Sequence, residues 1–187
     1  GTTVNASYNT VRLAATSVGV NFGSAAVSVS VTPTVNLRNN NFVNLSTAAG
    51  SGLTLAYRRS GPTLSTYGSS SNNNNFFAGA PSATNVIFFD GTTSDQTLAA
   101  YRARVAARDS SAVTENPSFT SITASDTTFL HINTVTPTQL ESGAASVSGI
   151  TDDFDGDTRN ATAPDIGADE FNGVALDLTA PTITYAA

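Results

Sequence analysis

Apolar and small polar residues alternate along the first ninety residues, and clusters of Gly, Asn and Ser interrupt the alternation. The clearest run is Ala26–Thr32, in which valine recurs at every second position. A period of two places these valines on one face of a strand. Shorter runs at Val35–Arg38 and Leu53–Tyr57 predict two further strands. The continuous apolar block Asn85–Phe89 predicts a strand that is covered on both faces.

Short strands separated by turn clusters are typical of a β-sandwich, a β-barrel or a β-solenoid. One recurrence favours the solenoid. Runs of asparagine followed by phenylalanine occur as NNNFVN at 39–44 and as NNNNFF at 72–77, with a looser relative at Val20–Phe22. Stacked coils place like residues above like, so we predict asparagine ladders at the turns, stacked phenylalanines inside, and coils of roughly 20 to 35 residues.

One segment, Ser94–Arg108, has a helical pattern. Leu98 and Val105 fall on one face, and the alanines favour helix. Ser94 or Asp95 is a suitable N-terminal cap. We therefore expect a short amphipathic helix that packs against the flank of the solenoid.

Composition narrows the class of protein. The chain has no Cys, Met or Trp, and its formal net charge is −6, because 14 acidic residues outnumber 8 basic ones, all of them arginine. The lack of cysteine excludes disulfides and thiolate metal ligands. Without a basic stripe a nucleic-acid partner is not expected. No apolar run approaches the roughly 20 residues that cross a bilayer, so no transmembrane segment is expected either. Few charges with much Ser, Thr, Asn and Gly are typical of extracellular bacterial β-proteins, so we expect an extracellular or cell-surface location.

Half of the acidic residues lie within 152–170, whereas Asp90 is the only one in the first ninety residues. Two motifs occupy this tail, Asp-x-Asp-Gly-x-x-Arg at 153–159 and Asp-Ile-Gly-Ala-x-Glu at 165–170. Together they resemble the C-terminal signature of secreted bacterial proteins of the pectin-lyase-like superfamily, described as choice-of-anchor parallel β-helix proteins. The likeness spans residues 85–183 and is closest to large surface proteins of Bacteroidetes that use type IX secretion.

The resemblance implies an all-β fold, namely the end of a right-handed parallel β-helix with a short flanking helix and an acidic C-terminal cap. It implies that residues 1–173 are the C-terminal coils and cap of the β-helix. Residues 174–187 would be a linker and the start of an immunoglobulin-like repeat.

The acidic tail has two interpretations, which are compatible with each other. In the first, Asp153, Asp155 and Asp157 around Gly156 resemble half of a calcium loop and offer oxygen ligands to a hard cation. The loop departs from an EF-hand because it lacks a glutamate at the twelfth position and flanking helices. Calcium is the one cofactor that the sequence suggests.

In the second interpretation the tail is a structural cap built from Arg159, Asp165, Asp169 and Glu170. Arg159 would pair with Asp165 or Glu170, while aspartate side chains hold the turns. A solenoid needs such a cap, because its last coil has unpaired strand edges and uncovered core residues.

Few residues suggest catalysis or ligand binding. His131 is the only histidine and lies in a strand-like run, and no Gly-x-Ser-x-Gly elbow occurs, so we expect a structural role and predict no catalytic residue. Four neighbouring residues suggest a weak sugar-stacking patch: Tyr57, Arg58, Arg59 and Tyr67.

These observations predict a non-catalytic extracellular module that serves as a rigid spacer or adhesin segment of a large bacterial surface protein. Its expected partners are other domains of the same chain and a polysaccharide or cell-surface glycan. Two alternatives stay open: the tail of a polysaccharide-lyase-like enzyme whose catalytic residues lie in upstream coils, and a carbohydrate-binding module. Hydrolysis by paired carboxylates is disfavoured, because the predicted coils hold Asp90 alone.

Overall fold

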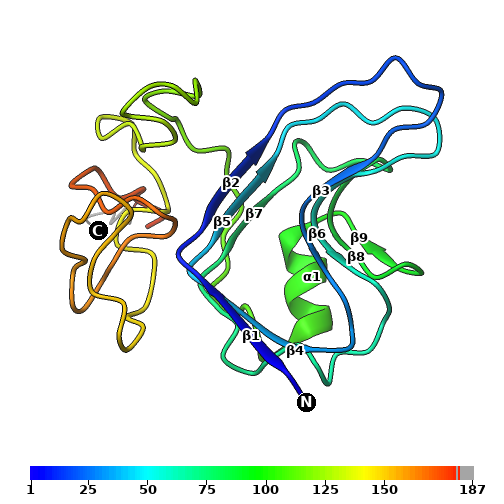
Figure 1. The fold of residues 1–187 in the computed structure, drawn as a ribbon, viewed down its shortest axis with the longest axis horizontal. Helices are drawn as coiled ribbons and strands as arrows, with labels where there is room; N and C mark the ends of the chain where they lie inside the picture. The colour runs from blue at the N-terminus through cyan, green and yellow to red at the C-terminus, as the bar shows by residue number, and fades with distance from the viewer. Residues whose placement is uncertain (180, 182–187) are drawn as a thin grey trace, which may run out of the picture.

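The computed structural model describes residues 1–179 and 181, in which strands dominate, one short helix occurs and no barrel closes (Figure 1). The first pass of the chain forms β1 (Thr3–Ser7), β2 (Thr10–Leu13) and β3 (Ser24–Val29). The second forms β4 (Thr34–Arg38), β5 (Asn41–Asn44) and β6 (Thr54–Arg59). The third forms β7 (Asn75–Phe77) and β8 (Asn85–Phe89), followed by β9 (Ser94–Asp95) and α1 (Leu98–Val105). The fold is all-β, as the sequence predicts.

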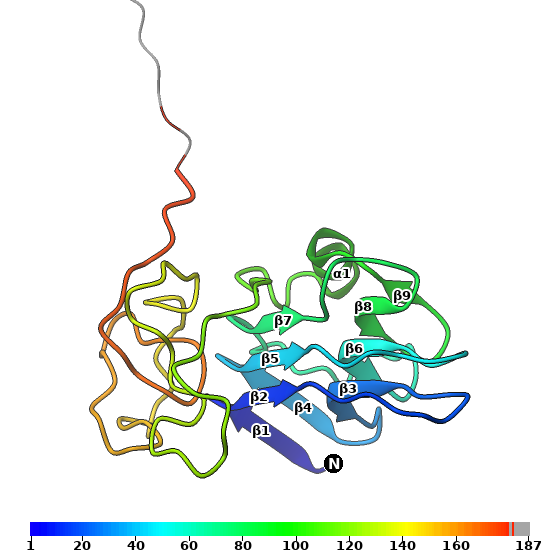
Figure 2. The same ribbon diagram turned by 90° about the horizontal axis from the view of Figure 1, so that it is seen from above.

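Strands from successive passes, which we call coils, pair in parallel and form three sheets, β1–β4, β2–β5–β7 and β3–β6–β8 (Figure 2). Thr10 lies beside Asn41, so the first and second coils are 31 residues apart. Asn41 lies beside Asn75, so the next spacing at this corner is 34 residues. Both spacings fall within the predicted range.

The predicted asparagine ladder and phenylalanine stack are both present. Asn9 Nδ2 donates to Asn40 Oδ1 at 2.8 Å, and Asn40 Nδ2 donates to Asn74 Oδ1 at the same distance. On the same coils the rings of Phe42 and Phe76 stack with centroids 5.8 Å apart. A buried amide that loses its partner costs about 1–3 kcal/mol, so the ladder fixes the register of the coils.

The sequence did not reveal the first coil. The looser repeat at Val20–Phe22 is not part of the stack, since Phe22 forms an antiparallel bridge with Ala49. The true counterpart of the Asn–Phe runs is Asn9–Val11, and Val11 lies beside Phe42. Valine in place of phenylalanine concealed the repeat. The strands β5 and β7 were also missed, because they begin at asparagines that we assigned to turns.

The three strands predicted from alternation are confirmed as β3, β4 and β6, and the continuous apolar block is confirmed as β8, with ends that differ by a few residues at most. The helix is shorter than predicted, because Ser94 and Asp95 pair antiparallel with β8 instead of capping α1. Thr97 is the cap, and its Oγ1 accepts a hydrogen bond from Ala100 N at 3.2 Å.

The helix closes one end of the coil stack, and the prediction that it lies on the flank was wrong. In Figure 1 α1 lies inside the outline of the coils, and in Figure 2 it lies beyond β7 and β8. Its buried residues Tyr101 and Val105 join the core that contains Tyr57, Phe76 and Phe88. A helix this short needs tertiary packing, and the last coil needs a cover. The packing of α1 against the last coil stabilises the helix and covers the coil.

Residues 114–179, which we call the C-terminal region, lie against the flank at the corner between β1 and β2, so they do not seal the last coil as predicted (Figures 1 and 2). They contain isolated bridges but no regular helix or strand. The corner is formed by Tyr8, Asn39 and Asn73, which all have positive φ. Tyr8 Oη donates to Ala145 O at 3.0 Å, and Asn39 Nδ2 donates to the same oxygen at 2.7 Å.

The C-terminal region continues past the predicted boundary at residue 173. Thr138 N donates to Val174 O and Leu176 N donates to Thr138 O, both at 2.9 Å. Half of the predicted linker and immunoglobulin-like start at 174–187, namely residues 180 and 182–187, lies outside the described residues.

Candidate functional site

The predicted sugar-stacking residues do not form a surface. Tyr57, Arg59 and Tyr67 are each 0% exposed, and only Arg58 reaches solvent. The Tyr57 ring stacks on Phe76 with centroids 5.7 Å apart in the middle of the core. Alternation along β6 explains the outcome, since Tyr57 and Arg59 share the inner face and Arg58 points outward.

A buried carboxylate, Asp109, ends the asparagine ladder beneath α1. Its Oδ1 accepts from Asn74 Nδ2 at 2.8 Å, and its Oδ2 accepts from the hydroxyls of Tyr67 and Tyr101. Burial raises the pKa of Asp109, although these hydrogen bonds oppose the shift. The carboxylate is 0% exposed and accepts three hydrogen bonds from buried side chains, so we assign it a structural role.

The Asp-rich loop is a tight hairpin organised by Asp153. Asp153 Oδ1 accepts from the backbone N–H groups of Asp155 at 2.8 Å and Asp157 at 2.9 Å, and Oδ2 accepts from Glu170 N at 2.9 Å. Burial acts to raise the pKa of Asp153, but these backbone hydrogen bonds outweigh it and lower the pKa below its usual range. Gly156 supplies a positive φ of 91° at the turn.

The predicted calcium trio does not converge on one point. In the described part of the chain, only Asp155 of the three aspartates belongs to a group of side chains that could hold one ion. The other members of that group are His131, which we expected to be structural, and Asp169, which we assigned to the cap. The carboxylate of Asp153 accepts hydrogen bonds from three backbone N–H groups instead of facing Asp155 and Asp157.

His131 lies between two carboxylates at the surface of the C-terminal region. Its Nε2 is 3.1 Å from Asp155 Oδ2, and its Nδ1 is 3.6 Å from Asp169 Oδ1. Asp169 is oriented by the backbone, because Oδ2 accepts from Ile132 N at 2.8 Å. Burial, and then the negative charges of Asp153 and Asp155, raise the pKa of Asp169 above its ordinary value.

An open cavity of about 170 Å3 borders this cluster. Its apolar wall includes Phe129 and Phe154, which are 40% and 85% exposed. His131, Asp155 and Asp169 supply its polar groups. The cluster is therefore accessible to solutes, whereas the buried tyrosines of the coils are not.

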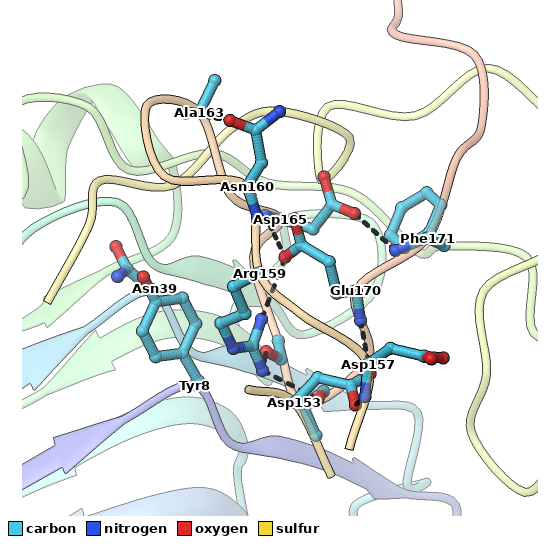
Figure 3. A network of polar contacts seen from close by, with 12 residues as sticks. Tyr8, Asn39, Asp153, Asp157, Arg159, Asn160, Ala163, Asp165, Glu170 and Phe171 are labelled. Carbon is cyan, nitrogen blue, oxygen red and sulfur yellow. Dashed lines mark hydrogen bonds and ion pairs between the residues drawn. The ribbon is translucent and has the colours of Figure 1, made fainter. Parts of the chain in front are cut away.

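Three of the predicted cap residues, Arg159, Asp165 and Glu170, lie together within the C-terminal region rather than over the last coil (Figure 3), and the fourth, Asp169, is half-buried beside His131. Arg159 Nη1 lies 3.2 Å from Glu170 Oε2, which confirms one of the two pairings considered. Arg159 Nη2 also donates to Gly167 O and Ala168 O at 3.2 and 2.8 Å. Its guanidinium lies 4.0 Å from the centre of the Tyr8 ring, so this arginine links the C-terminal region to the coils.

Asp165 has no cationic partner among the described residues and instead ties two loops together. Its Oδ1 accepts from Ser142 N at 2.6 Å, and its Oδ2 accepts from Phe171 N at 2.7 Å. Burial, with smaller contributions from the charges of Glu170 and Glu141, raises the pKa of Asp165 to about 7.

The raised pKa of Asp165 predicts that the protein loses stability as the pH rises. The folded state holds the Asp165 proton more tightly than the unfolded state does, so this stabilisation is complete below about pH 4 and is lost as the pH passes 7. The raised pKa values of Asp109 and Asp169 act in the same direction. We expect the free energy of unfolding to fall by about 2–4 kcal/mol between pH 4.5 and 8.

Urea denaturation at several pH values measures this slope, and Asp165→Asn should flatten it. The matched control is Asp177→Asn, because that carboxylate is fully exposed. Stability that rises steadily over the same range would contradict the assignment.

No protein-family model matches the chain, and neither the curated proteins nor the solved structures contain a match. No helix of the described residues is long and apolar enough to cross a membrane. The geometry of the chain is therefore the basis for the functional proposals that follow.

Proposed function

We propose that this chain is the terminal part of a right-handed parallel β-helix and acts as a non-catalytic structural module at the surface of a bacterial cell. The handedness rests on the rule that connections between parallel strands of one sheet are right-handed in about 98% of cases. The extracellular bacterial setting rests on the polar, charge-poor composition and on the motif resemblance in the acidic tail.

The observation that carries the proposal is the polarity of the asparagine ladder. Each Nδ2 donates toward the α1 end. The last bond, from Asn74, is to the Asp109 carboxylate, which has no N–H group and therefore needs no further acceptor. At the other end, among the described residues, the Oδ1 of Asn9 accepts no hydrogen bond. One end of the ladder is therefore complete, and the other end offers an acceptor to a further coil.

The strand edges are also unpaired at the end of the stack where Asn9 lies. In the described residues, β1, β2 and β3 each pair on one side only, with β4, β5 and β6. All four residues of β5 are buried, whereas those of β2 are only partly buried. Free parallel edges invite another strand, so a further coil is the natural cover.

A structural role is also supported by the carboxylates of the coils, which are engaged in local hydrogen bonds and an ion pair. Asp90 and Asp95 are the only acids within residues 1–97, all of which the structure describes. Asp90 Oδ1 accepts from Thr92 N and Thr93 N at 2.9 and 2.7 Å. Asp95 forms an ion pair with Arg104. Neither is available as an acid or a base on a coil face.

Duplication of the first coil tests the proposed β-helix. Thr3 corresponds to Thr34, so a second copy of residues 3–33 placed directly before Thr3 continues the register without a linker. We expect one cooperative unfolding transition, with a higher melting temperature and a larger urea m-value, because the added coil folds onto the free edges.

Two comparisons make this test specific. An added segment of the same composition in scrambled order should stay unfolded. Asn9→Ala in the added copy should lose about 1 kcal/mol of the gain, because its donor to the original Asn9 is missing. An unchanged m-value, with rapid amide exchange throughout the added copy, would refute the stacking proposal.

The non-catalytic part of the proposal has its own test. Neutral and acidic polysaccharides incubated with the protein should show no new reducing ends and no unsaturated uronate absorbance. Depolymerisation of any of them, lost when the protein is heat-denatured, would replace the structural role with an enzymatic one.

A further inference from the structure

We propose that His131, Asp155 and Asp169 bind one divalent transition-metal ion of the zinc class. The inference concerns the C-terminal region alone and does not depend on the role proposed for the coils. It replaces the calcium loop expected from the sequence, because it uses a different set of ligands and a different ion.

The donor set supports such an ion. One ring nitrogen of His131 and one oxygen from each of Asp155 and Asp169 lie within 4.8 Å of one another. Tetrahedral ligands at about 2.0–2.1 Å from zinc stand roughly 3.3 Å apart. The distance of 3.1 Å between His131 Nε2 and Asp155 Oδ2 is close to this value, and a small rotation of the Asp169 side chain would bring its oxygen to the same point. An imidazole favours transition metals over calcium, which prefers oxygen ligands alone.

Neighbouring groups hold the three proposed ligands in position. The ring of His131 is already oriented toward the two carboxylates, with Nε2 3.1 Å from Asp155 Oδ2 and Nδ1 3.6 Å from Asp169 Oδ1. The second oxygen of Asp169 is held by Ile132 N at 2.8 Å. The backbone position of Asp155 is fixed by its N–H bond to Asp153 Oδ1 at 2.8 Å.

Charge and access give separate support. In the described part of the chain, no arginine lies within 4 Å of the carboxylates of Asp155 or Asp169, so no guanidinium balances their negative charge. A divalent cation would neutralise both carboxylates. The adjoining cavity of about 170 Å3 opens this cluster to solvent and leaves room for the remaining water ligands.

The three ligands come from three separate segments of a region without regular secondary structure. His131 follows the bridge of Phe129 with Ser121, Asp155 lies in the Asp-rich hairpin, and Asp169 belongs to the last loop. An ion bound by all three would cross-link these segments and stabilise the folded region by mass action.

The composition of the chain leaves few other side chains that could bind zinc and confuse the test. With one histidine and no cysteine, protein without an affinity tag has a single imidazole and no thiolate that could bind zinc. Titration with zinc chloride at pH 7 should show one site by calorimetry and should shift the His131 ring resonances. At a free zinc concentration 100 times Kd, the melting temperature should rise by about 5–10 °C.

Variants distinguish this site from the Asp-rich loop. His131→Gln and Asp155→Asn should each weaken zinc binding at least about 10-fold. Asp157→Asn is the matched control, because this exposed carboxylate lies in the same hairpin and forms no side-chain hydrogen bond among the described residues; its zinc affinity should be unchanged. Calcium should bind at least about 10-fold more weakly than zinc. Melting curves with a chelator present verify that each variant folds.

Three results would overturn the proposal. One is the absence of zinc binding below millimolar concentrations. Another is binding that survives His131→Gln in a folded variant. The third is a loss of affinity as large for Asp157→Asn as for Asp155→Asn, which would place the ion in the loop that the sequence suggested.

Discussion

Tyr101→Ala should lower the free energy of unfolding by about 3–5 kcal/mol, because it removes the aromatic side chain that closes the coil stack. The Tyr101 ring lies 5.3 Å from the rings of both Phe76 and Phe88, and it is 0% exposed. Its loss leaves a cavity between α1 and the last coil. The hydroxyl also donates to Asp109, so the variant leaves a buried carboxylate with fewer donors.

Two further variants separate packing from hydrogen bonding at this end. Tyr101→Phe keeps the ring and should cost only about 1–2 kcal/mol, the penalty for one missing donor to a buried carboxylate. Ala103→Gln, at an exposed position of the same helix, should cost less than about 0.5 kcal/mol. Urea denaturation followed by circular dichroism measures all three. Equal small losses for Tyr101→Ala and Ala103→Gln would mean that α1 does not cover the core.

Arg159→Met should destabilise the C-terminal region by about 3 kcal/mol. The side chains of Arg159 and Glu170 are only 4% and 11% exposed, so removal of the arginine leaves a carboxylate buried without a cation. The contact with the Tyr8 ring is lost as well. Hydrogen exchange should show the effect first at the amides of Gly167 and Ala168, which bond to the coils.

A second substitution tests the electrostatic cause. In the double variant Arg159→Met with Glu170→Gln the uncompensated charge is gone, so we expect about 1 kcal/mol or more of the loss to be recovered. Arg58→Met is the control, because Arg58 is exposed and its loss should be almost neutral. A double variant less stable than Arg159→Met alone would show that the pair does not act through charge.

Local sequence patterns were sufficient to predict the repeating parts of the fold, which are the strands of the coils and their stacked side chains. Alternation identified β3, β4 and β6, because every second side chain of these strands faces the core, and the continuous apolar block identified β8. The recurrence of asparagine before phenylalanine predicted the ladder from Asn40 to Asn74 and the stacked rings of Phe42 and Phe76. The first coil was not predicted, because Val11 stands where the second coil has Phe42, although the two residues lie side by side in the sheet.

Prediction of the candidate site was less complete. The acidic tail that the sequence singled out contains Asp155 and Asp169 of the candidate site, and the pairing of Arg159 with Glu170 was among those expected. The metal-ligating group was not foreseen, because His131 lies 24 residues before Asp155 and only the folded loops bring them together.

By itself the sequence determined the features that depend on neighbours along the chain or on a regular repeat: strands, the ladder and stack of the coils, and the acidic character of the tail. Only the tertiary structure decided that α1 covers the last coil while the tail packs on the flank, and that Tyr57 and Arg59 are internal. The physical reason is that burial and electrostatic pairing depend on distances through space. In loops without a regular period, sequence spacing does not determine those distances.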